Sequence, residues 1–259
     1  MSPSPWKVFG ALVRRDVHVV SRELPSFLLR TTLNPIMFTI VFGYLLPRMG
    51  FVQGTYAGAV LPGILGISLA FASVQAVALP MVADFGWTRE IEDRLLAPVP
   101  IWVIALEKVV SGTAQGVIAA LFVLPVARLI MGPIEALSIA HLGVVIVMTL
   151  LGAFAFSAFG LLLGSAIRGE QIGLMFGLIV APMIFFGCAY YPWQALSVAR
   201  PLQIAVLVNP LVYVSEGMRG ALTPVLPHMP LGIVTVALIV ISAAFLLLGL
   251  RTFERRAVS

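Results

Sequence analysis

The chain has 259 residues, of which 60% are hydrophobic and only 10% are charged, and its mean hydropathy is +1.07. Soluble globular domains carry about 25% charged residues, so this composition excludes that class and predicts one all-α membrane domain over residues 1–259. The net charge of +5 does not indicate nucleic-acid binding, because the basic residues are scattered through short loops and are not gathered on one face.

Residues 1–25 predict an amphipathic helix that lies among the lipid headgroups. Apolar residues recur at a helical period between Trp6 and Leu24, with basic residues on the opposite arc. Asp16 falls inside the apolar arc, which indicates that this face meets protein as well as lipid. The alternative is a plain basic anchor that only sets topology. The charged residues assigned to this interface helix are Arg14, Arg15, Asp16 and Arg22.

Six apolar stretches are long enough to cross a bilayer, which takes about 20 residues of helix. They are Phe27–Leu46, Ala57–Val82, Ile101–Ile130, Ser138–Ser165, Ile172–Tyr191 and Leu231–Leu250. Six spans place both termini on one side. With that side cytoplasmic, only four of the 16 Lys and Arg residues fall outside, namely Arg48, Arg128, Arg200 and Arg219. The positive-inside rule therefore predicts cytoplasmic termini.

The densest charge of the chain lies between the second and third stretches, in residues 84–99. Glu90 and Arg94 are spaced for an ion pair on a short helix, while Ile91 and Leu95 share its apolar edge. Such a helix suits insertion into a groove on a partner protein, although a solvated helix on the membrane surface is the alternative. The predicted contact residues are Trp87, Arg89, Glu90, Ile91, Glu92, Asp93, Arg94 and Leu95.

Residues 190–230 are too apolar for an exposed loop. Ala195 to Val208 form a helical run that is too short to cross the bilayer, so the segment predicts a re-entrant or interfacial hairpin on the outer side. Aromatic residues near the outer ends of the spans form either an interfacial belt or the outer lining of a translocation path. The candidates for that lining are Tyr44, Phe185, Phe186, Tyr190, Tyr191 and Trp193.

Two segments carry a family resemblance. The first reads Arg89-Glu90-Ile91-Glu92-Asp93-Arg94-Leu95-Leu96-Ala97-Pro98-Val99. The second comprises Phe185-Phe186-Gly187, Pro192, Pro201, Asn209-Pro210-Leu211, Tyr213 and Arg219. Both resemble the corresponding motifs of ABC-2 type permeases, the membrane subunits of ATP-driven exporters. The departures are Gly187-Cys188, where Ser-Gly is usual, and Glu216 near the usual Asp.

The resemblance implies a homodimer of six-span subunits in the bacterial inner membrane, with two copies of an ABC ATPase docked on the loop helix and the interface helix. The chain has no Gly-x4-Gly-Lys-Ser/Thr motif. We therefore expect no cofactor, metal site or catalytic residue in this chain, and ATP and Mg²⁺ on the partner. The implied substrate of outward transport is hydrophobic or amphiphilic, with a lipid-linked polysaccharide or glycolipid as the alternative.

Two classes of protein that need no ATPase are the alternatives. A membrane transferase could bind a divalent cation at Glu90, Glu92 and Asp93, but arginines flank them and no second acidic cluster completes a site. An ion-coupled carrier would keep ionisable residues at mid-membrane. Here the ionisable residues near the spans lie close enough to a membrane–water interface for their side chains to reach it. They are Glu107, Lys108, Arg128 and His141. The predicted fold is thus six membrane helices with an N-terminal amphipathic interfacial helix and an outer re-entrant hairpin before the last helix.

Overall fold

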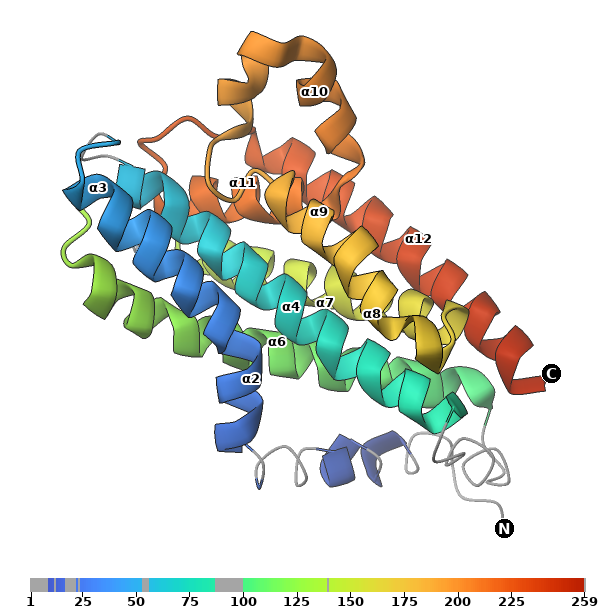
Figure 1. Cartoon of the computed structure of the whole chain (residues 1–259). Helices are drawn as coiled ribbons and strands as arrows, with labels where there is room; N and C mark the ends of the chain where they lie inside the picture. Colours follow the sequence, from blue (N-terminus) through green and yellow to red (C-terminus); the bar gives the residue numbers. More distant parts are fainter. Residues whose placement is uncertain are drawn as a thin grey trace.

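The computed structural model describes residues 9–11, 13–16, 22, 24–52, 56–86, 100–138 and 140–258, and every regular element within them is helical. Five helices in these ranges are long and apolar enough to cross a membrane (Figure 1). They are α2 to α3 (Leu24–Arg48, with the wider turn η1 at Thr39–Leu45), α4 (Tyr56–Gly86), α6 (Ile101–Met131), α7 (Leu142–Ala166) and α12 (Leu231–Val258). The predicted all-α membrane class is confirmed.

Helix α4 is the centre of the bundle. In its most apolar stretch 83% is buried, against 17% for α12, and it packs against α2, α6, α7 and the short helix α11 (Pro210–Leu222). Small residues permit this packing, because a Cβ atom at Gly164 of α7 would lie 2.8 Å from Met81 Cβ and 2.9 Å from Ala78 Cα. The backbones of α4 and α7 therefore approach directly.

Hydroxyl groups in the first membrane helix are satisfied within that helix. The Oγ1 atoms of Thr31, Thr32 and Thr39 donate to the carbonyl oxygens four residues earlier, over 2.6 to 2.8 Å. Apolar surroundings provide no other partner for such groups, so this local bonding lets threonine sit inside the span.

The fifth predicted span differs from the continuous helix expected over Ile172–Tyr191. The helical part is shorter, Gly169–Phe185, and consists of η2 (Gly169–Gln171), α8 (Ile172–Met175), η3 (Phe176–Val180) and α9 (Ala181–Phe185). The chain then turns, with the amide of Phe186 bonded to the Pro182 carbonyl oxygen at 2.9 Å. Cys188, three residues after the end of α9, has a φ of 51°, a left-handed conformation that cannot continue a helix toward Tyr191.

A bent pair of helices precedes α12, as the sequence predicts. Its first arm contains η4 (Trp193–Ala199), α10 (Arg200–Ala205) and η5 (Val206–Val208), and its second arm is α11, at 104° to the first. Asn209 sets the corner, because its Oδ1 accepts from the Leu211 amide at 3.0 Å and Pro210 opens α11. The first arm stands off one end of the bundle, whereas residues 9–11 and 13–16 and the end of α12 lie toward the other (Figure 1).

Candidate functional site

The predicted interface helix is attached to the third membrane helix by an ion pair. Residues 9–11 and 13–16 are helical, and Asp16 Oδ2 lies 3.1 Å from Lys108 Nζ in α6. The two side chains are only 14% and 8% exposed, and Lys108 Nζ also lies 3.8 Å from Glu107 Oε2. The protein contact that the sequence predicts for Asp16 is therefore confirmed.

This cluster corrects the expectation that Glu107 and Lys108 extend to the membrane surface. The Glu107 side chain is fully buried, and Lys108 lies between its carboxylate and that of Asp16. Burial raises the pKa of Asp16, but its hydrogen bond with Glu107 and the charge of Lys108 outweigh burial, so the pKa lies below its ordinary value. Arg14 and Arg22 are exposed, and Arg15 NH2 lies 3.1 Å from Asp16 Oδ1.

The predicted coupling segment lies outside the described residues. This applies to all eight positions assigned to it, namely Trp87, Arg89, Glu90, Ile91, Glu92, Asp93, Arg94 and Leu95. Its role remains a prediction.

A second buried ion pair lies at the opposite end of the bundle, between Glu216 and Arg219 of α11. Both side chains have no exposed surface, and Arg219 NH1 donates to Glu216 Oε1. The same carboxylate accepts the backbone amides of Trp193 at 2.9 Å and Met229 at 2.7 Å. Glu216 therefore joins the two ends of the segment between α9 and α12.

Arg219 extends these links to two further elements. Its NH2 donates to the carbonyl oxygens of Ala59 in α4 at 3.0 Å and of Cys188 at 2.9 Å, and its Nε donates to Ala59 at 3.2 Å. This role of Arg219 differs from the outer loop charge expected from the sequence. The available signal was a Glu and an Arg three residues apart in a segment too apolar to be a loop.

The six aromatic candidates for a path do not form one lining. Tyr190 is 7% exposed and stacks on Phe42 with ring centroids 4.3 Å apart. Tyr44 is bound by Arg48, whose NH1 lies 2.7 Å from the Tyr44 hydroxyl. The first of these contacts joins Tyr190 to the first membrane helix, and the second lies within that helix.

The remaining candidates lie at or after the end of α9. The Tyr191 hydroxyl donates to the Phe185 carbonyl oxygen at 3.1 Å, and Trp193 Nε1 donates to that of Gln203 at 2.9 Å. Phe185 and Phe186 are 57% and 46% exposed. A translocation role for all six residues remains a prediction.

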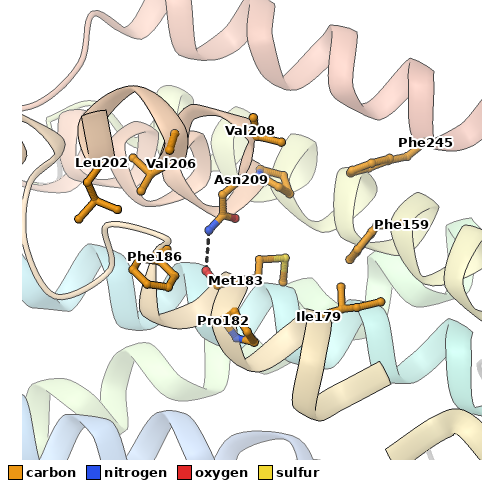
Figure 2. A pocket seen from close by; sticks show the side chains of 12 residues that line it. Phe159, Ile179, Pro182, Met183, Phe186, Leu202, Val206, Val208, Asn209 and Phe245 are labelled. Carbon is orange, nitrogen blue, oxygen red and sulfur yellow. Dashed lines mark hydrogen bonds between the residues drawn. The ribbon is translucent and has the colours of Figure 1, made fainter. Parts of the chain in front are cut away.

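Phe186 borders an apolar groove of about 570 Å³ between α7, α9, α12 and the first arm of the hairpin (Figure 2). Phe159 and Phe245, with ring centroids 4.8 Å apart, form one end of it. Asn209 contributes an amide, whose Nδ2 donates to the Met183 carbonyl oxygen at 2.6 Å. Of the six aromatic candidates, the lining contains Phe186 alone.

The long apolar helices and the bent pair before the last helix define a multi-pass membrane protein. Residues 7–223 match the sequence profile described as ABC-2 type transporter, so the chain belongs to that family and is a membrane permease of an ABC transporter. The resemblance of the two motif segments is thereby confirmed. The matched range runs from the interface helix to the end of α11.

Similar proteins are named as transport permeases. The chain is 27% identical over 229 residues to "Inner membrane transport permease YadH" of Escherichia coli strain K12, covering 83% of this chain and 82% of the relative. The YadH proteins of Escherichia coli O157:H7 and of Shigella flexneri have the same identity and coverage.

Proposed function

We propose that the chain is the membrane subunit of an exporter, which moves a hydrophobic or amphiphilic substrate outward with ATP hydrolysed by a separate subunit. The observation that carries this proposal is the buried ion pair between Asp16 and Lys108. Because it ties the interface helix to α6, a push on that helix would reach the membrane bundle directly. An ATPase docked on that side could therefore drive the bundle.

In this proposal, two ABC ATPase subunits contact the interface helix and residues 87–95, and they bind the ATP and Mg²⁺. The chain lies in the bacterial inner membrane, as the names of its YadH relatives suggest, with both termini cytoplasmic. The arrangement of residues 9–16 and the end of α12 at one end of the bundle supports this orientation (Figure 1). The aromatic residues at the other end would border the exit.

The fifth helix offers a face for a second copy of the chain. Leu174 and Leu178 are 61% and 72% exposed, and no atom lies within 4 Å of a Cβ atom built at Gly173 or Gly177. Glycines four residues apart permit close approach of two membrane helices. This face supports a homodimer, with a path between the two subunits.

The ATPase partner is tested by purifying the tagged chain from its native membranes in mild detergent. We expect a P-loop ATPase at near-equal stoichiometry, and its loss from the double variant Glu92→Arg/Leu95→Asp. Glu135→Arg, an exposed position in the loop after α6, is the control and should retain the ATPase. Recovery of the wild-type chain alone, where a known exporter keeps its ATPase, would contradict the proposal and favour a carrier or a membrane transferase.

The direction of transport is tested with the purified complex in proteoliposomes. A panel of fluorescent amphiphiles is offered to complexes whose ATPases face outward, so that export appears as uptake into the lumen. Uptake should require ATP and Mg²⁺ and should stop when vanadate is added. ATP-driven release of preloaded amphiphile from the same vesicles would indicate import and would contradict export.

A further inference from the structure

Apart from Phe186 at its border, the groove between α7, α9, α12 and the hairpin is not used in the proposal above. We propose that it binds an acyl chain of a membrane phospholipid, which enters sideways between α9 and α12. The inference rests on the chemistry of the lining, on where the groove opens and on what else could fill it. It does not depend on the direction of transport.

The lining selects hydrocarbon. Its walls are mostly aromatic, aliphatic, proline and thioether side chains, and the Phe159–Phe245 ring pair forms one end (Figure 2). The only polar side chain among the lining residues is Asn209, whose Nδ2 donates to the Met183 carbonyl oxygen and whose Oδ1 accepts from the Leu211 amide. A sugar, nucleotide or charged group would lose its hydrogen bonds to water there without adequate replacement.

The groove opens toward the hydrocarbon of the bilayer. Helix α12 crosses the membrane with only 17% of its most apolar stretch buried. Phe245 of α12 lines the groove, and the exposed side chains elsewhere on this helix include the apolar Val236 and Val240, at 62% and 61%. The rim is equally apolar, with Ile179 38% and Val208 87% exposed. A neighbouring lipid tail therefore meets apolar side chains at the rim of the groove.

Backbone geometry keeps the groove open. The 104° bend at Asn209 and Pro210 holds the first arm of the hairpin away from α9, and the Asn209 amide bonded to Met183 fixes their separation. Water would be a poor filler, because a buried water needs two to four polar partners. A volume of about 570 Å³ lies within the usual range of ligand sites and suits a chain-shaped occupant.

The test uses the full-length protein in lipid nanodiscs that contain a phospholipid with a diazirine on one acyl chain. After illumination, labelled positions are mapped by peptide mass spectrometry. We expect labelling of residues 179–186 and of the region around Phe245 above that at Leu129, a residue of α6 that is 84% exposed and outside the groove. Labelling no higher than at Leu129 would overturn the proposal, because it would show ordinary contact with lipid.

Ala205→Trp places an indole in the lining and should lower groove labelling by about threefold or more, since a large aromatic group displaces the chain. Val198→Trp is the matched control on the same arm, because Val198 is 92% exposed and does not border the groove. It should label as the wild type does. If Ala205→Trp fails to fold, Val208→Trp fills the groove from its exposed rim. Unchanged labelling in the folded filling variant would overturn the proposal.

A second copy of the chain is the competing occupant. Val208→Cys tests it, because the single native cysteine, Cys188, is buried and does not interfere. If lipid fills the groove, we expect the Val208→Cys chain to form no intermolecular disulfides after mild oxidation. Efficient disulfide-linked dimers would show that protein covers the groove and would overturn the lipid assignment.

Discussion

At the residue scale, the outer end of the molecule depends on Glu216 and Arg219. One carboxylate and one guanidinium bind four backbone groups from four separate places in the chain, at residues 59, 188, 193 and 229. Each charge is fully buried, so each is tolerable only in the presence of the other. The four partner residues contribute only backbone groups to these contacts. The types of their side chains in the sequence therefore do not indicate that the contacts exist.

Removing the charge of Glu216 should destabilise the protein strongly. Glu216→Gln leaves Arg219 buried without a counter-charge, and we expect a loss of about 3 kcal/mol or more in the free energy of unfolding. Thermal unfolding of the purified protein, followed by size-exclusion chromatography, measures it. Glu135→Gln, an exposed carboxylate, is the control and should unfold as the wild type does. Equal midpoints for the two variants would contradict the assigned role.

Gly63 is a second position where one atom decides the packing. A Cβ atom there would lie 1.9 Å from the Ala189 carbonyl oxygen, so α4 must move away from the turn after α9. Gly63→Ala should cost about 3 kcal/mol. Gly143→Ala in α7 meets no atom within 4 Å and should stabilise by about 0.5 kcal/mol, because alanine favours helix. The same unfolding measurement compares them, and a similar effect of both would count against this close approach.

At the element scale, the interface helix is held to α6 by a charge cluster. The lowered pKa of Asp16 means that its ionised form is favoured in the folded protein. The contribution of Asp16 to stability is therefore complete above its unfolded-state pKa and is lost as the pH falls through its lower folded-state pKa. At neutral pH the attachment to α6 is intact.

Asp16→Asn should loosen the helix without unfolding the bundle. We expect amide hydrogen exchange of residues 9–16 to accelerate about tenfold, which corresponds to a loss of about 1.4 kcal/mol. The double variant Asp16→Lys/Lys108→Asp should recover part of the protection. Arg14→Gln, an exposed position on the same helix, is the control. Unchanged exchange in Asp16→Asn would show that the ion pair does not hold the helix.

At the scale of the whole molecule, the fifth helix presents two neighbouring faces with different proposed neighbours. Leu174, Leu178 and the open glycines face a second subunit in our proposal. Ile179, Met183 and Phe186 face the groove. Because successive residues on a helix point about 100° apart, a dimer contact and a lipid site can share this helix without overlapping.

Leu178→Cys should form disulfide-linked dimers in membranes under mild oxidation. Its side chain is 72% exposed on the proposed dimer face, while native Cys188 is buried. Leu129→Cys, on the exposed face of α6, is the control and should remain monomeric on a non-reducing gel. Dimers from Leu129→Cys and none from Leu178→Cys would place the interface elsewhere.

The membrane class, the places of the long helices and the protein contact of Asp16 followed from the sequence alone. Length and hydropathy suffice for these, because a bilayer requires about 20 apolar residues from each crossing helix. An acidic residue on an apolar arc likewise requires a buried partner. The hairpin before α12 was recognisable for a related reason, since its apolar arm is too short to cross.

Only the tertiary structure decided how these elements meet. Lys108 as the partner of Asp16, the backbone contacts of Glu216 and Arg219, the early end of the fifth helix and the groove beneath the hairpin all join residues distant in the chain. Hydrophobic periodicity reports which side of a helix is apolar, but it carries no information on which neighbour covers that side. That choice depends on close packing and on buried hydrogen bonds, which exist only after the chain has folded.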